Sequence, residues 1–98
     1  MAKIDPRLTQ AIDEAKDGAS LQAVFTLRSD EPDKPLAPAQ TEARVKAVVD
    51  AASAKVSRAP NRVVVFPNLQ SFSIDANALL IQNLLDAEHI ETATLNKA

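Results

Sequence analysis

The sequence predicts an α+β fold: a ferredoxin-like βαββαβ sandwich with an antiparallel sheet and an extra N-terminal helix. Two observations predict it. The apolar residues change along the chain between a period near 3.6, typical of helices, and a period of two, typical of strands. The segments so defined follow in the order helix, strand, helix, strand, strand, helix, strand, so two strand–helix–strand units come after the first helix. The chain has 98 residues, the length of a single domain, which we assign to residues 1–98.

The first helix is predicted over residues 6–16. Asp5 can cap it, and Pro6 suits the first helical position because proline needs no hydrogen bond there. A strand is then predicted over residues 21–28, where apolar and more polar side chains alternate. Its apolar side comprises Leu21, Ala23, Phe25 and Leu27.

A long helix is predicted from Pro38 to about residue 58, because valines and alanines keep helical spacing there. The β-branched run at residues 62–66 predicts a strand, and Pro67-Asn68 is a typical turn pair. A further strand is predicted over residues 69–75. The two runs form either a hairpin or one strand interrupted by a bulge.

The third helix is predicted to begin after Asp75 or Asn77 and to continue through Ala87, and residues 90–95 are predicted to form the last strand. The inward positions of these elements define an expected core. It comprises Phe25, Val45, Val49, Phe72, Ile74, Leu80, Ile81 and Leu84.

The composition argues against several classes of protein. The chain has no cysteine, one glycine (Gly18) and one histidine (His89). It therefore lacks a thiolate nucleophile, a glycine-rich phosphate loop and a pair of histidines for a metal ion. We expect a protein that is not an enzyme and that uses no cofactor and no metal. The net charge of −2 favours neither nucleic acid nor a membrane as a partner.

No signal sequence is recognisable, and the longest apolar runs are too short to cross a membrane. As written, the chain is expected to be cytoplasmic. If it is cut from a longer precursor, it is expected to be secreted.

Basic side chains are concentrated in residues 44–62, with five of them against one acidic side chain, Asp50. This segment is either a solvated helix face followed by a loop, or a contact strip for an acidic partner. The basic residues are Arg44, Lys46, Lys55, Arg58 and Arg62.

The second strand predicts an apolar patch on the side of the sheet that the helices leave open. Because side chains alternate across a strand, Val64 and Phe66 lie on one side of it and Val63 and Val65 on the other. One of these pairs must face outward, and Val24 of the first strand is assigned to the same side as Val64 and Phe66. Such a patch is covered by the first helix, by a second copy of the chain, or by another protein.

Several segments form a pattern of apolar residues that extends over most of the chain. Lys3-Ile4-Asp5-Pro6-Arg7-Leu8 precedes the strand at 21–28, and the second half contributes residues 66–74, 79–85 and 89–91. This pattern resembles the propeptides of subtilisin-like serine proteases and the stand-alone inhibitors built on the same domain. The resemblance implies a protein-binding module that inhibits such a protease or assists its folding.

The resemblance also implies how the module binds. The open sheet face, with Val24, Val64 and Phe66, would contact two surface helices of the protease. The C-terminal tail would enter the active-site cleft as an added strand, with Ala98 in the primary specificity pocket and Leu95 in an apolar pocket. The tail residues are Thr94, Leu95, Asn96, Lys97 and Ala98.

Two further expectations concern this tail and the competing function. Deleting residues 95–98 is expected to leave stability nearly unchanged, because none of them belongs to the expected core. Thr94 and Leu95 stand where acidic residues are expected in the family. The alternative function is a structural or regulatory ferredoxin-like domain that self-associates through the open face of its sheet.

Overall fold

The structure is a computed structural model that describes residues 3–15, 19–28 and 37–96. Within this part of the chain, helices and strands combine in one α+β unit, so the predicted fold class is confirmed at that level. In chain order the elements are β1 (Lys3–Ile4), α1 (Pro6–Glu14), β2 (Ser20–Leu27), α2 (Pro38–Val56), β3 (Arg62–Phe66), the 3₁₀ turn η1 (Pro67–Leu69), β4 (Ser71–Asn77), α3 (Ala78–Leu85) and β5 (Ile90–Leu95).

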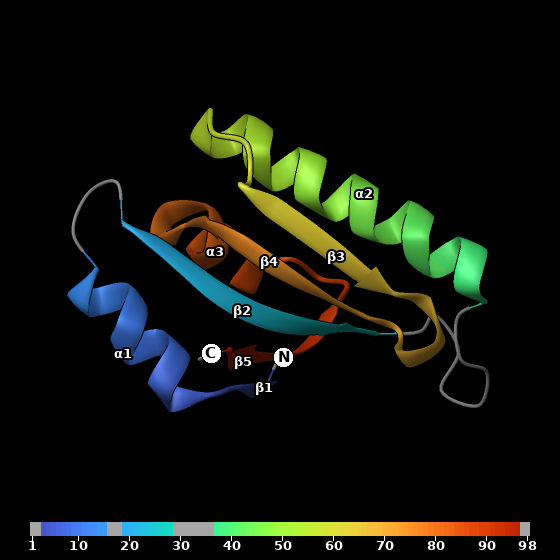
Figure 1. The fold of residues 1–98 in the computed structure, drawn as a ribbon, viewed down its shortest axis with the longest axis horizontal. Helices are drawn as coiled ribbons and strands as arrows, with labels where there is room; N and C mark the ends of the chain where they lie inside the picture. Colours follow the sequence, from blue (N-terminus) through green and yellow to red (C-terminus); the bar gives the residue numbers. More distant parts are fainter. Residues whose placement is uncertain (1–2, 16–18, 29–36, 97–98) are drawn as a thin grey trace.

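The strands form one sheet in the order β1-β5-β2-β4-β3 (Figure 1). β2 is antiparallel to both of its neighbours, β4 and β5, and β3 is antiparallel to β4. β1 is parallel to β5, with Lys3 opposite Thr92 and Ile4 opposite Ala93. The sheet is therefore mixed, and the prediction of a purely antiparallel sheet is wrong. Two residues are too few to show an alternating pattern, and β1 was therefore not predicted.

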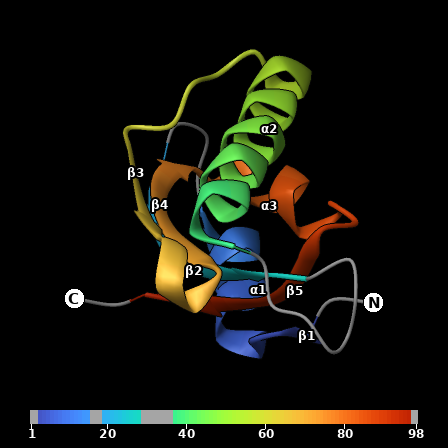
Figure 2. The same cartoon turned by 90° about the vertical axis from the view of Figure 1, so that its right-hand side faces the viewer.

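α2 and α3 lie on the same side of the central strands (Figure 2). The core fills the space between these helices and the sheet, because every second residue of β2 and β4 points toward them. Leu8 of α1 belongs to this core and is fully buried. All eight residues of the expected core are buried, namely Phe25, Val45, Val49, Phe72, Ile74, Leu80, Ile81 and Leu84.

The helix boundaries follow from local chemistry. Asp5 caps α1, because its Oδ1 accepts a hydrogen bond from the Arg7 amide at 3.0 Å. Asn77 caps α3 in the same way, accepting from the Leu79 amide at 2.8 Å. Between the two candidates for this cap, the structure therefore selects Asn77. α2 ends at Val56 because Ser57 adopts a left-handed conformation with φ of 55°.

The turn between β3 and β4 decides whether the apolar runs at residues 62–66 and 69–75 form a hairpin or one bulged strand. They form an antiparallel hairpin, with Val64 opposite Ser73 and Phe66 opposite Ser71. Pro67–Leu69 form the 3₁₀ turn between them, so β4 begins two residues later than predicted. Gln70 ends this turn in a left-handed conformation with φ of 51°.

Candidate functional site

The candidate site is the face of the sheet opposite α2 and α3. Cross-strand partners share a face, so the register defines its members row by row. Thr94, Val24, Ser73 and Val64 form one row across β5, β2, β4 and β3. The next row toward the β3–β4 turn is made by Thr92, Thr26, Ser71 and Phe66. We call this surface the open face.

Three apolar side chains lie among the hydroxyl and amide groups of the open face. They are the residues singled out from the sequence, Val24, Val64 and Phe66. Val24 and Val64 are half-buried, and Phe66 is 39% exposed. Val64 and Phe66 line a hollow of about 290 Å³, together with Gln22, Arg62, Ser73, Asp75 and Asn96 among others. The face therefore combines a small apolar area with polar side chains of both charges.

The first helix does not cover the open face. α1 contacts β5 and α3, and its Leu8 is buried in the core on the helical side of the sheet. Of the three covers considered for Val24, Val64 and Phe66, the chain's own first helix is therefore ruled out. A second copy and a different protein remain as candidates for this face.

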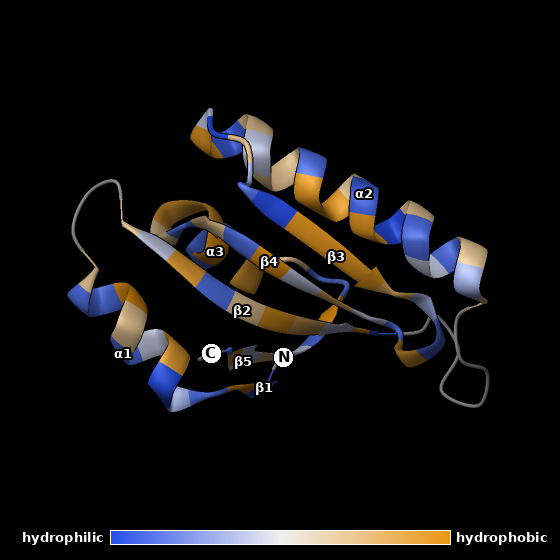
Figure 3. Ribbon diagram, viewed as in Figure 1, coloured by the Kyte–Doolittle hydropathy of each residue, from blue (hydrophilic) through white to orange (hydrophobic). Residues whose placement is uncertain are grey.

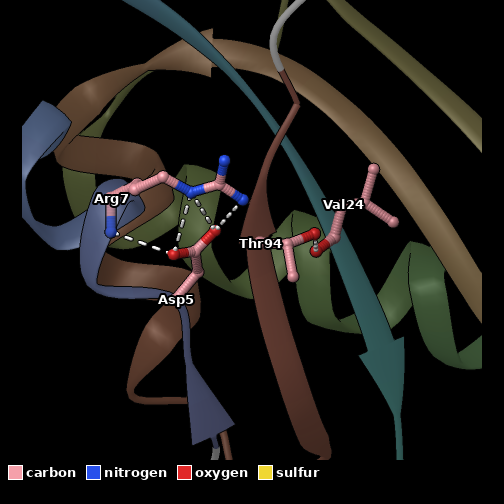
Figure 4. A network of polar contacts seen from close by, with 4 residues as sticks. All are labelled: Asp5, Arg7, Val24 and Thr94. Carbon is pink, nitrogen blue, oxygen red and sulfur yellow. Dashed lines mark hydrogen bonds and ion pairs between the residues drawn. The ribbon is translucent and has the colours of Figure 1, made fainter.

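Thr94 and Leu95 belong to β5, which confirms the last strand predicted over residues 90–95, and they do not form the free tail that the resemblance implies. Thr94 lies opposite Val24 and its hydroxyl donates to the Val24 carbonyl at 3.4 Å, as Figure 4 shows. Leu95 lies opposite Ala23 and is half-buried against the core. The Asn96 amide still donates to the Gln22 carbonyl at 3.0 Å.

These contacts correct the expected tail. Leu95 can reach an apolar pocket of a partner only if the end of β5 separates from β2. The expectation that deleting residues 95–98 leaves stability nearly unchanged rests on none of them belonging to the core, and this premise is wrong for Leu95, whose side chain packs against the core. Lys97 and Ala98 lie outside the described residues.

A charged pair fixes the start of α1 beside β5. Arg7 donates from Nη2 to Asp5 Oδ2 at 3.0 Å and from Nε to the same oxygen at 3.2 Å (Figure 4). These side-chain bonds, and then the bond from the Arg7 amide, lower the pKa of Asp5. The Asp5 amide donates to the Ala93 carbonyl at 2.8 Å, so the helix cap is attached to β5.

The basic side chains of residues 44–62 do not gather into one strip. Arg62 lies in the hollow on the open face, whereas Lys46 lies beside β3 on α2 and Lys55 lines a separate groove between α2 and α3. Arg44 approaches His89, with 3.5 Å between its Nη1 and His89 Nδ1. The interpretation as a solvated helix face and loop agrees with this spread.

A second surface feature was missed by sequence reasoning. A groove of about 350 Å³ lies between α2 and β3, lined by Val45, Val49, Pro60, Val63 and Val65 together with the charged residues Glu42, Lys46 and Asp50 of α2. Figure 3 shows β3 as hydrophobic along most of its length. The signal was present in the sequence as a valine run without a charge, but only the strand order places that run at the edge of the sheet.

The described residues include no cluster of three or more His, Asp or Glu side chains arranged to hold a metal ion. None of the described helices combines the length and the apolar character needed to cross a membrane. In comparisons with known proteins, no family model, no curated protein and no solved structure matches this chain.

Proposed function

We propose that this chain is a protein-binding module of the subtilisin-propeptide type, which binds a subtilisin-like serine protease through the open face and inhibits it or assists its folding. The observation that carries the proposal is the position of Val24, Val64 and Phe66 on one uncovered face of the sheet. Apolar side chains on a sheet face that none of the described helices covers are typical of a contact surface.

The strand arrangement supports the finer assignment of the fold. Without β1, the order β5-β2-β4-β3 with two helices on one face is the arrangement expected of a ferredoxin-like βαββαβ sandwich. We include this assignment in the proposal, with β1 as an additional parallel strand at the β5 edge.

The tail has a smaller part in this proposal than the resemblance implied. With Thr94 and Leu95 held in β5, the sheet supplies most of the contact and only residues after Asn96 continue toward the cleft. In this proposal Lys97 and Ala98 would pair with a cleft edge by backbone hydrogen bonds.

The direct test is to incubate the purified chain with subtilisin and to follow hydrolysis of a chromogenic peptide. Val64→Lys is expected to weaken inhibition at least about tenfold, because an unpaired ammonium would be buried in the contact. Ala43→Lys is the matched control, because it adds the same charge at an exposed position of α2. Equal inhibition by both variants would exclude the open face as the contact.

The alternative function is self-association through the same face. Sedimentation of the chain without protease separates the two. A dimer that Val64→Lys dissociates, in a protein that does not inhibit subtilisin, would support self-association and reject the proposal. A monomer that inhibits supports the proposal.

A further inference from the structure

β3 is the edge strand at one end of the sheet, and its outer side has no partner strand among the described residues. Such an edge presents backbone N–H and C=O groups to any segment that can pair with it. The question is which groups of β3 point outward, because in an antiparallel pair they alternate along the strand.

The neighbouring hydrogen bonds answer this question. Gln70 and Ala78 flank β4, and both bond toward β2. Ala78 donates to the Ala19 carbonyl at 3.1 Å, and the Gln70 carbonyl accepts from the Leu27 amide at 2.7 Å. The even-numbered residues of β4 therefore bond to β2. The alternate residues of β4, among them Ser73 and Asp75, therefore bond to β3. The Asp75 carbonyl points to this side, because it accepts from the amide of Asn61, the residue before β3, at 2.8 Å.

The same alternation fixes the orientation of β3. Val64 lies opposite Ser73, so its amide and carbonyl point toward β4. The amides and carbonyls of Val63 and Val65 then point away from the sheet. The edge thus offers two donors and two acceptors with the spacing of an antiparallel partner strand.

The groove described above lies directly beside these groups. Val63 and Val65 line it from β3. The opposite wall belongs to α2, where Val45 and Val49 lie among the charged residues Glu42, Lys46 and Asp50. A strand that pairs with Val63 and Val65 would place its two pairing residues on the same face as their partners. Those two side chains would enter the groove.

This edge lacks the usual protection against strand pairing. Natural edge strands often carry a lysine, a proline or a bulge in the middle. Here Val63, Val64 and Val65 form an uncharged centre, and prolines stand only outside the strand, at Pro60 and Pro67. The prolines limit the segment open to pairing to a few residues.

We propose that the β3 edge is a docking site for a short extended peptide, which adds a sixth strand antiparallel to β3 and places two alternate small apolar side chains in the groove. The occupant is a peptide of another protein with the pattern polar–Val–polar–Val–acidic, read from its N-terminus. The first valine pairs with Val65 and the second with Val63, and the acidic residue lies beside Arg62. Arg62 has no ion pair with another described residue.

A second copy of this chain fits the edge poorly. α2 lies along the β3 edge and projects beyond it in the view of Figure 1. Two β3 strands paired across a two-fold axis would lie about 4.8 Å apart, whereas packed helices need about 8–10 Å between their axes. Two α2 helices that both project over the shared edge would collide. A single peptide strand carries no helix of its own, so it would avoid this collision and would pack against α2.

This site is separate from the contact proposed with a protease, because that contact uses the open face. The experiment uses the full chain, labelled with ¹⁵N, and the synthetic peptide acetyl-Thr-Val-Thr-Val-Glu-amide as the probe. Hydrogen exchange of single amides is followed by NMR with and without the peptide at about millimolar concentration. In the free chain we expect fast exchange at Val63 and Val65 and slower exchange at Val64, whose amide bonds to β4. The peptide is expected to slow exchange at Val63 and Val65.

Two modified peptides provide matched controls. Methylation of both valine nitrogens removes the donors that face β3, and this is expected to weaken binding at least about tenfold. Methylation of the central threonine nitrogen, which points away from β3, is expected to leave the affinity within about twofold.

Three results would overturn the proposal. The first is the absence of any peptide-dependent protection at Val63 and Val65. The second is equal affinity of the two methylated peptides. The third is protection of both amides that rises with protein concentration when no peptide is present, which would show that a second copy occupies the edge.

Discussion

Phe25 and Phe72 lie directly opposite each other on β2 and β4 and stack with their ring centroids 5.3 Å apart and their planes 16° from parallel. Both rings are fully buried. Because β2 and β4 are central strands, this pair connects the two strand–helix–strand units of the chain and lies behind the open face.

Phe72→Ala should therefore destabilise the protein by about 3–5 kcal/mol, through lost burial and the cavity left behind. Phe66→Ala is the matched control, since Phe66 is 39% exposed at the end of β3 and should cost about 1 kcal/mol or less. Urea unfolding of both variants measures the difference. Similar costs for the two would contradict the assignment of Phe72 to the core.

The sequence was sufficient to predict the elements that carry a clear period. The alternation in β2 and the helical spacing in α2 each extend over many residues, and both elements were predicted to within about two residues at either end. The burial of Phe25, Val45 and Leu80 followed from the same periods. Period alone also placed Val64 and Phe66 on one side of their strand, and the register shows that Val24 shares this face.

Other features depend on contacts that a single sequence does not reveal. β1 has two residues and exists because it pairs with β5, so its formation is set by a partner about ninety positions away. Leu95 was predicted to end the last strand, but the resemblance also implied that it enters a protease cleft, and β2 and the core hold it in the sheet. The groove at the β3 edge requires the strand order, which no local pattern specifies.

Ser57→Gly should raise the stability of the protein. Ser57 adopts φ of 55° at the end of α2, a conformation that costs a residue with a side chain about 1 kcal/mol relative to glycine. We expect a gain of about 0.5–1 kcal/mol in thermal or urea unfolding, since glycine also loses more entropy on folding.

Ala47→Gly is the control for this substitution, because Ala47 is an exposed residue inside α2. There the same introduction of glycine should cost about 1 kcal/mol. Destabilisation by both variants would mean that the left-handed conformation at Ser57 carries no strain.

The pair Asp5 and Arg7 should make stability depend on pH in the acidic range. Hydrogen bonds from the Arg7 side chain hold the pKa of Asp5 below its ordinary value in the folded state. A lowered folded pKa gives a stabilisation that is complete above the unfolded pKa of about 3.9 and is lost as the pH falls through the folded pKa.

Asp5→Asn removes this charge while keeping a residue that caps helices well. Its loss of stability relative to the natural chain should be present at pH 6 and should shrink steadily below about pH 4. Thermal unfolding at a series of pH values measures this. A difference that stays constant down to pH 2 would assign the effect to the cap alone and not to the charge.

Two truncations separate the contribution of Leu95 and Asn96 to the sheet from the contact with a protease that is proposed for the end of the chain. Removal of Lys97 and Ala98 leaves the bond from the Asn96 amide to the Gln22 carbonyl in place, so the free energy of unfolding should stay unchanged. Removal of Leu95 and Asn96 as well takes away that bond and the half-buried Leu95 side chain, at a cost of about 1–2 kcal/mol. Urea unfolding reports these costs, and inhibition of subtilisin is measured on the same samples.

If the end of the chain blocks the cleft, the shorter truncation should already abolish most of the inhibition while the stability is intact. If the shorter truncation inhibits fully, the open face alone makes the contact, and inhibition should fall only when the loss of Leu95 loosens β5.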